Sequence, residues 1–475
     1  MSILLVFDDR RGVEVELTAL VGAARFGDIV FRRQTLYDRM CSLVRKLGWQ
    51  IVRVDSADSP DTVEQRLAEG HTRVVHVASW VVPTLEVTAL DRLERVAMVS
   101  DPCLATLDGV PIPLFATSSE QYLKSFASLA MLDSAQSGMV QVPFDNSFVD
   151  ISNLSGMVDF LSGAFGSRHF NSVTRTRQQV VKFSSDSDKI KAEHDYYHLV
   201  PESMRRWFVM PYDLKKDERG ASYTMERLQV LDMGQQWING GLSVDDFDRF
   251  LEDVVRFLDE RPRRTCPRTR AVANFDQLYV TKVQKRLKEF ESYPLCSYVN
   301  DMLRNSTGVG SLSELFQRYF DLLSPYRQRV PDFESIGHGD LCFSNILYDK
   351  RIRLLKLIDP KGATAGDELY TDPAYDYAKL SHSVLGGYDF IVNGLCNIFI
   401  DKDLRLRLHT PEPDFDAYAT RFIAQLESAD IEVRQVRLYE ASLFLSMLPL
   451  HRDNPHSVLA FALVAAHIIK EVDVQ

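Results

Sequence analysis

Residues 336–349 read Ile-Gly-His-Gly-Asp-Leu-Cys-Phe-Ser-Asn-Ile-Leu-Tyr-Asp, and residues 355–362 read Leu-Lys-Leu-Ile-Asp-Pro-Lys-Gly. The two stretches carry three oxygen-bearing side chains, Asp340, Asn345 and Asp359. Transfer of a phosphoryl group from ATP needs a carboxylate that orients and deprotonates the acceptor, and oxygen ligands for magnesium. One loop can hold Asp340 beside the acceptor and turn Asn345 toward the metal. The apolar run 355–358 predicts a strand that delivers Asp359 to the same ion.

Two neighbouring features have more ordinary interpretations. A single aspartate is often a helix cap or an ion-pair partner, but the ordered set of residue types at these spacings favours a phosphotransferase site. His338 is grouped with the catalytic residues, and we expect it to support the loop through hydrogen bonds rather than to act as the base. Lys361 could reach a carboxylate or phosphate of a substrate, or it could be a solvated lysine, and both interpretations stay open.

The segment resembles the catalytic loop and metal-binding turn of aminoglycoside phosphotransferases, choline kinases and related kinase-like small-molecule phosphotransferases. That family has His-Gly-Asp, four residues, Asn, and then Ile-Asp-x-x-Gly. Residues 372–380, Asp-Pro-Ala-Tyr-Asp-Tyr-Ala-Lys-Leu, are similar to its Asp-Pro-x-x-Asp-Leu-Ala stretch. The resemblance implies that Asp376 braces the catalytic loop and that ATP and Mg²⁺ are the cofactors.

A site of this kind needs a lysine for the α- and β-phosphates and a helix glutamate that holds the lysine. Residues 178–183 predict a strand that carries Lys182 near its end, and residues 189–199 predict a helix that carries Glu193. The strand predicted at 223–228 leads into the connection between two lobes, where backbone groups near Glu226 and Leu228 would bind adenine.

A loop with two glycines precedes this strand and helix. Gly163, Gly166 and Ser167 could turn over the nucleotide phosphates, because glycine lets the backbone approach them closely. Two glycines in a loop also fit an ordinary turn.

The length of 475 residues predicts two or three domains at ~150 residues each. Strand patterns at 3–7, 50–55 and 74–82 alternate with helix patterns at 36–47 and from Pro60, which favours an α/β layer with a mainly parallel sheet. We therefore predict an α/β domain over residues 1–150, followed by an α+β kinase-like bilobal domain. Its small lobe is placed at 156–231 and its helical lobe, with the catalytic loop, at 232–475.

The order of elements in residues 1–150 is similar to that of sugar-phosphate nucleotidyltransferases, with Arg10–Gly12 after the first strand and residues 31–36 leading a helix. Asp8 and Asp9 stand where small residues would let the backbone approach a triphosphate, and two carboxylates repel phosphate unless metal intervenes. We favour a degenerate domain that is kept for packing, for homo-oligomer formation or for substrate presentation.

Composition excludes several classes of partner. The net charge of −11 disfavours nucleic acid, and the basic segment 261–270 is interpreted as a solvated connection. Six scattered cysteines without a CxxC pair indicate neither a zinc ribbon nor a disulfide framework. The start of the chain is too acidic for a signal peptide, and the apolar run 458–469 is shorter than the ~20 residues needed to span a bilayer. These features predict a cytoplasmic protein without a membrane span.

The predicted function is therefore that of an ATP- and Mg²⁺-dependent kinase for a small molecule. Residues 379–390 resemble kinase-like proteins of capsule and surface-polysaccharide biosynthesis, which implies a sugar, polyol or amino alcohol as the acceptor. Two alternatives remain. One is a bifunctional kinase and nucleotidyltransferase, and the other is a scaffold that binds nucleotide without turnover. A scaffold has no physical need for a base and two metal ligands.

Overall fold

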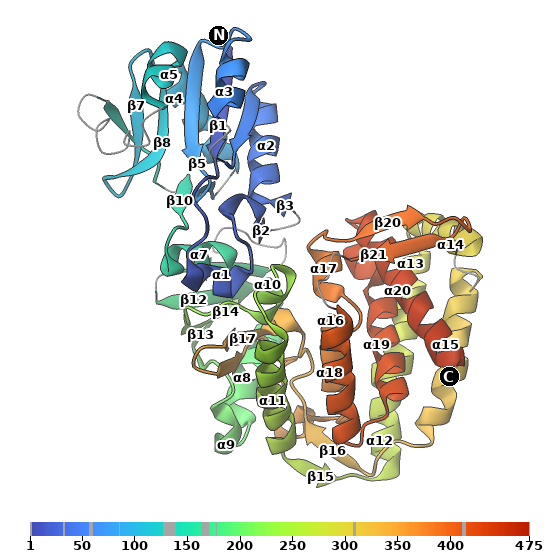
Figure 1. The fold of residues 1–475 in the computed structure, drawn as a ribbon. Helices are drawn as coiled ribbons and strands as arrows, with labels where there is room; N and C mark the ends of the chain where they lie inside the picture. The colour runs from blue at the N-terminus through green and yellow to red at the C-terminus, as the bar shows by residue number, and fades with distance from the viewer. Residues whose placement is uncertain are drawn as a thin grey trace. The chain divides into compact units, whose positions relative to one another are not determined.

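The computed structural model describes residues 2–31, 34–56, 60–84, 86–126, 139–145, 147–162, 171–176, 178–306, 310–410 and 415–474. The chain divides into two compact units, coloured from blue to red along the sequence in Figure 1. One unit comprises Met1–Gly166 with Asn239–Gly241, and the other comprises Ser167–Ile238 with Leu242–Gln475. The first unit extends beyond the predicted boundary, because the residues that follow 156 lie in a helix of the first unit rather than in the small lobe.

The first unit contains seventeen described elements. In chain order they are β1 Ile3–Asp8, α1 Val15–Val21, η1 Phe26–Asp28, β2 Val30–Phe31, β3 Gln34–Thr35, α2 Leu36–Lys46, β4 Gln50–Val54, α3 Pro60–Leu67, β5 Arg73–Ala78, β6 Val81–Pro83, α4 Glu86–Met98, β7 Cys103–Leu107, β8 Val110–Ser118, α5 Ser119–Phe126, β9 Val140–Pro143, β10 Phe148–Asp150 and α7 Leu154–Leu161.

A six-stranded sheet in the order β4-β1-β5-β8-β7-β9 forms the centre of this unit. β1 is parallel to β4 and β5, and β7 is parallel to β9, but β8 is antiparallel to both of its neighbours. Five of the six strands therefore run in one direction, so the sheet is mainly parallel, as predicted, and β8 is its antiparallel strand. The reason for the reversal of β8 is local: Asp108 and Gly109, both with positive φ, join β7 to β8, and an Asp-Gly pair is the turn that closes a two-residue hairpin.

Both faces of the sheet are covered by helices, which explains why β1 is apolar at every position from Ile3 to Phe7. Successive side chains of a strand point to opposite faces. Leu5 and Phe7 pack into the core shared with α2 and α4, whereas Leu4 and Val6 pack into the core shared with α3 and α5. β5 is buried along its whole length for the same reason.

The second unit begins with a small lobe and continues into a helical lobe. The small-lobe elements are β11 Asn171–Arg175, β12 Gln179–Ser184, α8 Ser187–Leu199, α9 Glu202–Arg205, β13 Pro211–Asp217 and β14 Gly220–Glu226. The strands form an antiparallel sheet in the order β11-β12-β14-β13, in which Lys182 pairs with Tyr223. Helix α8 follows β12 and starts with Asp186, whose side chain accepts a hydrogen bond from the Lys189 N–H.

The helical lobe contains the rest of the described elements. They are α10 Met233–Ile238, α11 Val244–Glu260, β15 Arg263–Thr265, α12 Arg268–Phe275, the π-helical turn η2 Asp276–Thr281, α13 Lys282–Glu291, α14 Pro294–Ser306, α15 Leu312–Arg327, β16 Phe333–Ile336, η3 Phe343–Asn345, β17 Ile346–Asp349, β18 Leu354–Leu357, η4 Gly366–Leu369, β19 Tyr370–Thr371, α16 Tyr375–Val384, α17 Tyr388–Val392, β20 Asn397–Ile400, β21 Leu406–His409, α18 Phe415–Ser428, α19 Val433–Met447, η5 Leu448–His451 and α20 Pro455–Val474.

The core of this lobe lies among the long helices, with α19 and α20 packed side by side (Figure 1). The apolar run 458–469 belongs to α20, where it is buried against other helices. Among the described residues, no helix has the length and hydropathy of a membrane span. A helix that is apolar on several faces is typical of the centre of a helical domain.

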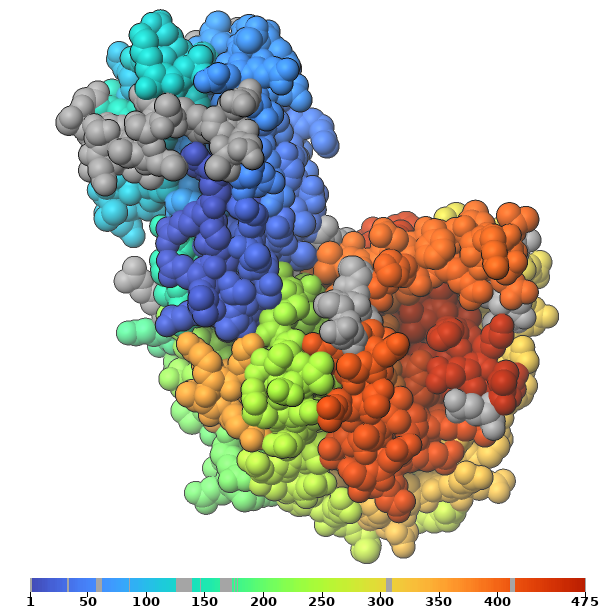
Figure 2. Space-filling model, viewed as in Figure 1, coloured from blue at the N-terminus to red at the C-terminus, as the bar shows by residue number. Residues whose placement is uncertain are grey.

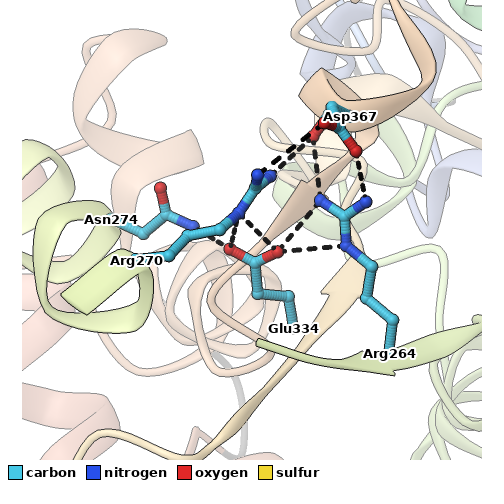
Figure 3. A network of polar contacts seen from close by, with 5 residues as sticks. All are labelled: Arg264, Arg270, Asn274, Glu334 and Asp367. Atoms are coloured by element: carbon cyan, nitrogen blue, oxygen red, sulfur yellow. Dashed lines mark hydrogen bonds and ion pairs between the residues drawn. The ribbon is translucent and has the colours of Figure 1, made fainter. Parts of the chain in front are cut away.

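An ion-pair network anchors β16, the strand that leads to the loop of residues 337–342 (Figure 3). The carboxylate of Glu334, almost completely buried in β16, accepts hydrogen bonds from Arg264, Arg270 and Asn274. Asp367 binds both arginines from the other side. The basic segment is therefore not the solvated connection that we expected, because it packs against this buried acid.

Candidate active site

His338 is the structural centre of the loop that follows β16. It is fully buried, its Nε2 donates to the carbonyl oxygen of Ile358 at 3.0 Å, and its Nδ1 accepts the N–H of Asp340 at 3.2 Å. Burial lowers the pKa of His338, so the ring is neutral and one nitrogen donates while the other accepts. One nitrogen thus bonds within the loop and the other bonds to the backbone that follows β18, so His338 connects these two segments.

Asp376, on α16, lies directly beneath the same loop. Its carboxylate accepts the backbone N–H groups of His338 and Gly339, each at 2.8 Å, and pairs with Arg261 at 2.9 Å. Both ionic side chains are buried. Because two backbone donors and one cation meet at this carboxylate, Asp376 can fix the conformation of residues 338 and 339. Arg261 was not singled out in the sequence, since its partner is more than a hundred residues away.

Replacing Arg261 by methionine is expected to lower the free energy of unfolding by ~3–5 kcal/mol, because the buried Asp376 carboxylate would lose its cation. Chemical denaturation monitored on the full chain measures this change. Arg263→Met is the matched control: Arg263 is exposed and its guanidinium lies 5.3 Å from the centre of the Phe333 ring, so the expected loss is below ~1 kcal/mol. Equal losses for the two variants would contradict the assigned brace.

Asp340 projects from the loop with a side chain that is 44% exposed. Its Oδ1 lies 2.7 Å from the ammonium of Lys379, and its Oδ2 accepts from the amide of Asn345 at 3.1 Å. Burial of the surrounding region would raise the pKa of Asp340, but the charge and hydrogen bond of Lys379 outweigh it and lower the pKa to about 2. The carboxylate is therefore ionised throughout the physiological pH range and can accept a hydroxyl hydrogen bond.

The antiparallel hairpin β17–β18 brings Asn345 and Asp359 to the same end. Asn345 directly precedes β17, Ile358 directly follows β18, and the Ile358 N–H donates to the Asn345 carbonyl at 3.1 Å. The amide nitrogen of Asn345 donates to Asp340, which leaves the amide oxygen for a metal. One carboxylate and one amide oxygen match the few protein ligands that Mg²⁺ takes beside substrate phosphates. No group of three acidic, histidine or cysteine side chains forms a metal cluster in the described part of the chain.

Lys182 joins the small lobe to this hairpin. Its ammonium lies 2.6 Å from Oε2 of Glu193 and 2.9 Å from Oδ1 of Asp359. Burial would lower the pKa of Lys182, but Asp359 and Glu193 outweigh burial and raise it. Tyr223 donates a further hydrogen bond to Glu193 at 3.2 Å. The lysine is thus charged and held between two carboxylates, one from each lobe.

Two backbone features place Asp359 beside Lys182. Asp359 has φ +57°, a left-handed conformation that aspartate tolerates better than most residues. Gly362 has φ +93° and packs against α8, where a Cβ would lie 2.9 Å from the carbonyl carbon of Ala192. The Ala363 N–H donates to the Ala192 carbonyl at 2.9 Å. Glycine at 362 therefore lets this turn dock against the helix that carries Glu193.

Five other residues were predicted to contact the nucleotide, and the structure does not bring them to Lys182 through any described contact. Gly163, Gly166 and Ser167 lie outside the described residues. Glu226 is the exposed last residue of β14, and Leu228 follows two positions later, partly buried. A contact of these two residues with adenine stays a prediction.

Three side chains near Asp340 were not predicted as part of the site. Lys379 lies one turn after Tyr375 on α16, and the Tyr375 hydroxyl accepts a hydrogen bond from Lys282 at 3.1 Å. The sequence motif that contains Tyr375 and Lys379 predicted a role for Asp376 but none for these two residues. Lys282 lies on a distant helix, and no sequence signal points to it. The backbone of Lys361 donates to the His338 carbonyl at 2.8 Å, and its side-chain stem packs along Gly339.

A pocket of about 860 Å³ lies elsewhere in the helical lobe, in the orange and red part of Figure 2. It is lined by the β20–β21 hairpin, α19, α20 and the turn at Gly386 and Gly387. None of the charged groups around Lys182 and Asp340 lines it. We place the chemistry at those charged groups, because phosphoryl transfer depends on charge stabilisation rather than on cavity volume.

Asp8 and Asp9 of the first unit form ion pairs with arginines of the same unit. The Asp8 carboxylate pairs with Arg10 at 2.8 Å, and the fully buried Asp9 pairs with Arg53 at 2.5 Å. Arg11 pairs with Glu14. These groups stabilise each other, so their charges are not directed at a triphosphate. Residues 32 and 33 lie outside the described residues.

No protein-family model and no curated protein matches the sequence. Among solved structures, the chain is similar to a thermostable mutant of aminoglycoside phosphotransferase APH(4)-Ia in its apo form. The identity is 12% and the TM-score 0.38, over 64% of this chain and 92% of that chain. For aminoglycoside phosphotransferase APH(3'')-Id from Streptomyces rimosus the values are 16% and 0.37, over 60% and 91%. For a glucosamine kinase they are 13% and 0.40, over 67% and 84%.

These neighbours are kinases of small molecules, but similarity at this level assigns neither fold nor activity to the chain. The functional conclusion therefore depends on the chain's own geometry.

Proposed function

We propose that the second unit is an ATP- and Mg²⁺-dependent phosphotransferase of kinase-like fold that acts on a small molecule in the cytoplasm. One observation carries this proposal: Lys182 bridges Glu193 of the small lobe and Asp359 of the helical lobe at 2.6 and 2.9 Å. A kinase requires this lysine–glutamate pair and a metal-binding aspartate in place together. The arrangement is supported independently by Asp340, which lies on a loop fixed by Asp376.

Each residue has one step in the proposed reaction. Lys182 binds the α- and β-phosphate oxygens of ATP. Asn345 and Asp359 would hold Mg²⁺, which neutralises charge on the phosphates when bound. Asp340 accepts a hydrogen bond from the acceptor hydroxyl and orients its oxygen toward the γ-phosphorus. The new O–P bond forms as the bond to the β-phosphate oxygen breaks, ADP leaves, and the hydroxyl proton passes to Asp340.

The lowered pKa of Asp340 indicates whether this carboxylate acts mainly by orienting the hydroxyl or by accepting its proton. A carboxylate with a pKa of about 2 is a weak base toward an alcohol. In a loose transition state the hydroxyl becomes acidic only as its oxygen bonds to phosphorus. Asp340 therefore acts mainly by orienting the hydroxyl, and it takes the proton late.

We infer that the acceptor is a sugar, polyol or amino alcohol, and that the product serves surface-polysaccharide synthesis. Support for this narrower proposal comes from the sequence of residues 379–390. ATP consumption by the full chain with Mg²⁺, measured against a panel of these alcohols and aminoglycosides, tests the function. We expect one class to stimulate ADP release at least tenfold over water, and excess EDTA to abolish the stimulation. A panel without any stimulation, at ATP concentrations that saturate binding, would refute the kinase proposal.

We further propose that the first unit is a degenerate nucleotidyltransferase-like domain without transfer activity, kept for packing or homo-oligomer formation. Asp8 and Arg10 satisfy each other's charge, as do Arg11 and Glu14. No pyrophosphate release is expected from nucleoside triphosphates mixed with sugar phosphates. Release that disappears in the Arg10→Ala/Arg11→Ala variant, while ADP formation persists, would establish the bifunctional alternative.

A further inference from the structure

On the basis of the proposed phosphotransfer function, we infer that the acceptor is an anion, an alcohol bearing a phosphate or carboxylate group, which Lys282 binds with Tyr375 and Lys379. This goes beyond the sugar, polyol or amino-alcohol class and disfavours cationic members of it. The starting observation is that positive side chains gather on the helical-lobe side of Asp340.

Lys282 carries a charge without a carboxylate partner in the described part of the chain. Its ammonium donates to the Tyr375 hydroxyl at 3.1 Å and lies 5.7 Å from the centre of that ring. The side chain is only partly buried, so a ligand can reach it. Further along the same helix, Arg286 pairs with Glu289 at 2.7 Å. An ammonium held by a neutral hydroxyl keeps its full attraction for an anion.

Lys379 adds a second cation, one helical turn after Tyr375 on α16. Its ammonium contacts Asp340 at 2.7 Å, so it lies where the reacting hydroxyl must arrive. Lys379 by itself could serve the γ-phosphate of ATP. Lys282 contacts the Tyr375 hydroxyl instead, so it adds a further positive charge to that of Lys379.

The pKa shifts of two neighbouring side chains have the sign expected in a positive electrostatic potential. Burial would raise the pKa of Tyr375, but Lys282 and Lys379 outweigh burial and lower it. Burial lowers the pKa of the His382 ring far below its usual value, and Lys379, Lys282 and His451 act in the same direction while Asp340 opposes them. The surroundings of Asp340 thus favour negative charge, and they would repel an aminoglycoside or a protonated amino alcohol.

The backbone before Lys282 is also unusual. Residues Asp276–Thr281 form the π-helical turn η2 between α12 and α13. An extra residue in a helical turn rotates the following side chains relative to the preceding ones, and such turns occur often at functional sites. Tyr279 in this turn stacks on Tyr439 at 3.9 Å and is fully buried, which fixes the turn. Because η2 runs directly into α13, this packed turn determines the direction in which Lys282 leaves the helix.

The test measures binding of matched acceptors to the full chain saturated with Mg²⁺ and the non-hydrolysable analogue AMP-PNP. Glucose, glucosamine, glucuronate and glucose 1-phosphate share one ring, and glycerol, glycerate and glycerol 3-phosphate share one chain. In at least one series we expect an anionic member to bind about tenfold or more tightly than the neutral member. The carboxylate and phosphate arms distinguish the two kinds of anion. Tighter binding of the neutral or cationic members, or no binding in either series, would overturn the inference.

Substitutions then assign the effect to Lys282. Lys282→Gln should weaken binding of the anionic acceptor about tenfold and leave the neutral one unchanged, and Lys282→Arg should restore most of the affinity. Lys288→Gln, an exposed lysine later on the same helix, is the matched control and should change neither. An equal effect of the two glutamine variants would refute the assignment. Binding of AMP-PNP reports separately on the ATP site, so its loss would count against the kinase proposal and not against the anion site alone.

Discussion

Asp340→Asn is expected to lower kcat at least 100-fold while the Kd for Mg²⁺-bound AMP-PNP changes less than about threefold. The substitution keeps the size of the side chain but removes the charge that is proposed to orient the acceptor hydroxyl and to take its proton. In the proposed mechanism ATP is bound through Lys182, Asn345 and Asp359, which the change leaves in place. Steady-state ADP formation and calorimetric titration with AMP-PNP measure the two quantities.

The hairpin that follows Asp340 provides a matched control. Asp349, at the end of β17, pairs with Arg351 at 2.8 Å and makes no contact with Asp340. Asp349→Asn should leave kcat within about twofold, since it removes the same charge from the same segment without touching the acceptor. A kcat above about one tenth of the original value in Asp340→Asn would exclude Asp340 as the acceptor-orienting residue.

Loss of the Asp359 carboxylate should have an even larger effect. Asp359→Ala is expected to reduce kcat at least about 1000-fold and to raise the Kd for Mg²⁺-bound ATP about tenfold or more. The carboxylate would hold Mg²⁺, which would neutralise charge on the phosphates, and it also pairs with Lys182 at 2.9 Å. Titration of ATP in excess EDTA separates these roles, because only the metal-dependent part of the affinity should disappear.

Asp332→Ala is the control for this variant. Asp332 is exposed shortly before β16, and its backbone carbonyl, which the substitution retains, accepts the Cys266 N–H at 2.8 Å. Activity and affinity should stay within about twofold. Unchanged affinity of Asp359→Ala for Mg²⁺-bound ATP would remove Asp359 from the metal site, whatever happened to turnover.

Local sequence patterns predicted much of the framework. Apolar runs marked β1, β4 and β5, and helix patterns marked α2, α3 and α8, because an element that packs on a core must repeat its apolar residues at its own period. The Asp-Gly pair at 108–109 is also a hairpin signal in the sequence, and it would have predicted the antiparallel β8. The predicted domain boundary near residue 150 lies before the observed end of the first unit. A polar stretch indicates a loop, but it does not indicate which unit the next helix belongs to.

The residues of the candidate site likewise divide into those that local sequence predicted and those that only the structure revealed. Spacing within one loop singled out Asp340 and Asn345, and the end of the following strand singled out Asp359. A strand followed by a helix singled out Lys182 and Glu193. A loop or a single strand–helix unit determines the distances between such residues, so the sequence carried this information by itself.

Only the tertiary structure decided which distant residues complete the site. Arg261 reaches Asp376 across 115 positions, and Lys282 reaches Tyr375 across 93. Contacts with the buried Glu334 made the basic segment part of the framework, and the packing of α13 in the lobe placed the Lys282 ammonium at the Tyr375 hydroxyl. The physical reason is that charges interact through space: the sequence determined the charges and their local order, and the packing of the helices determined which charges meet.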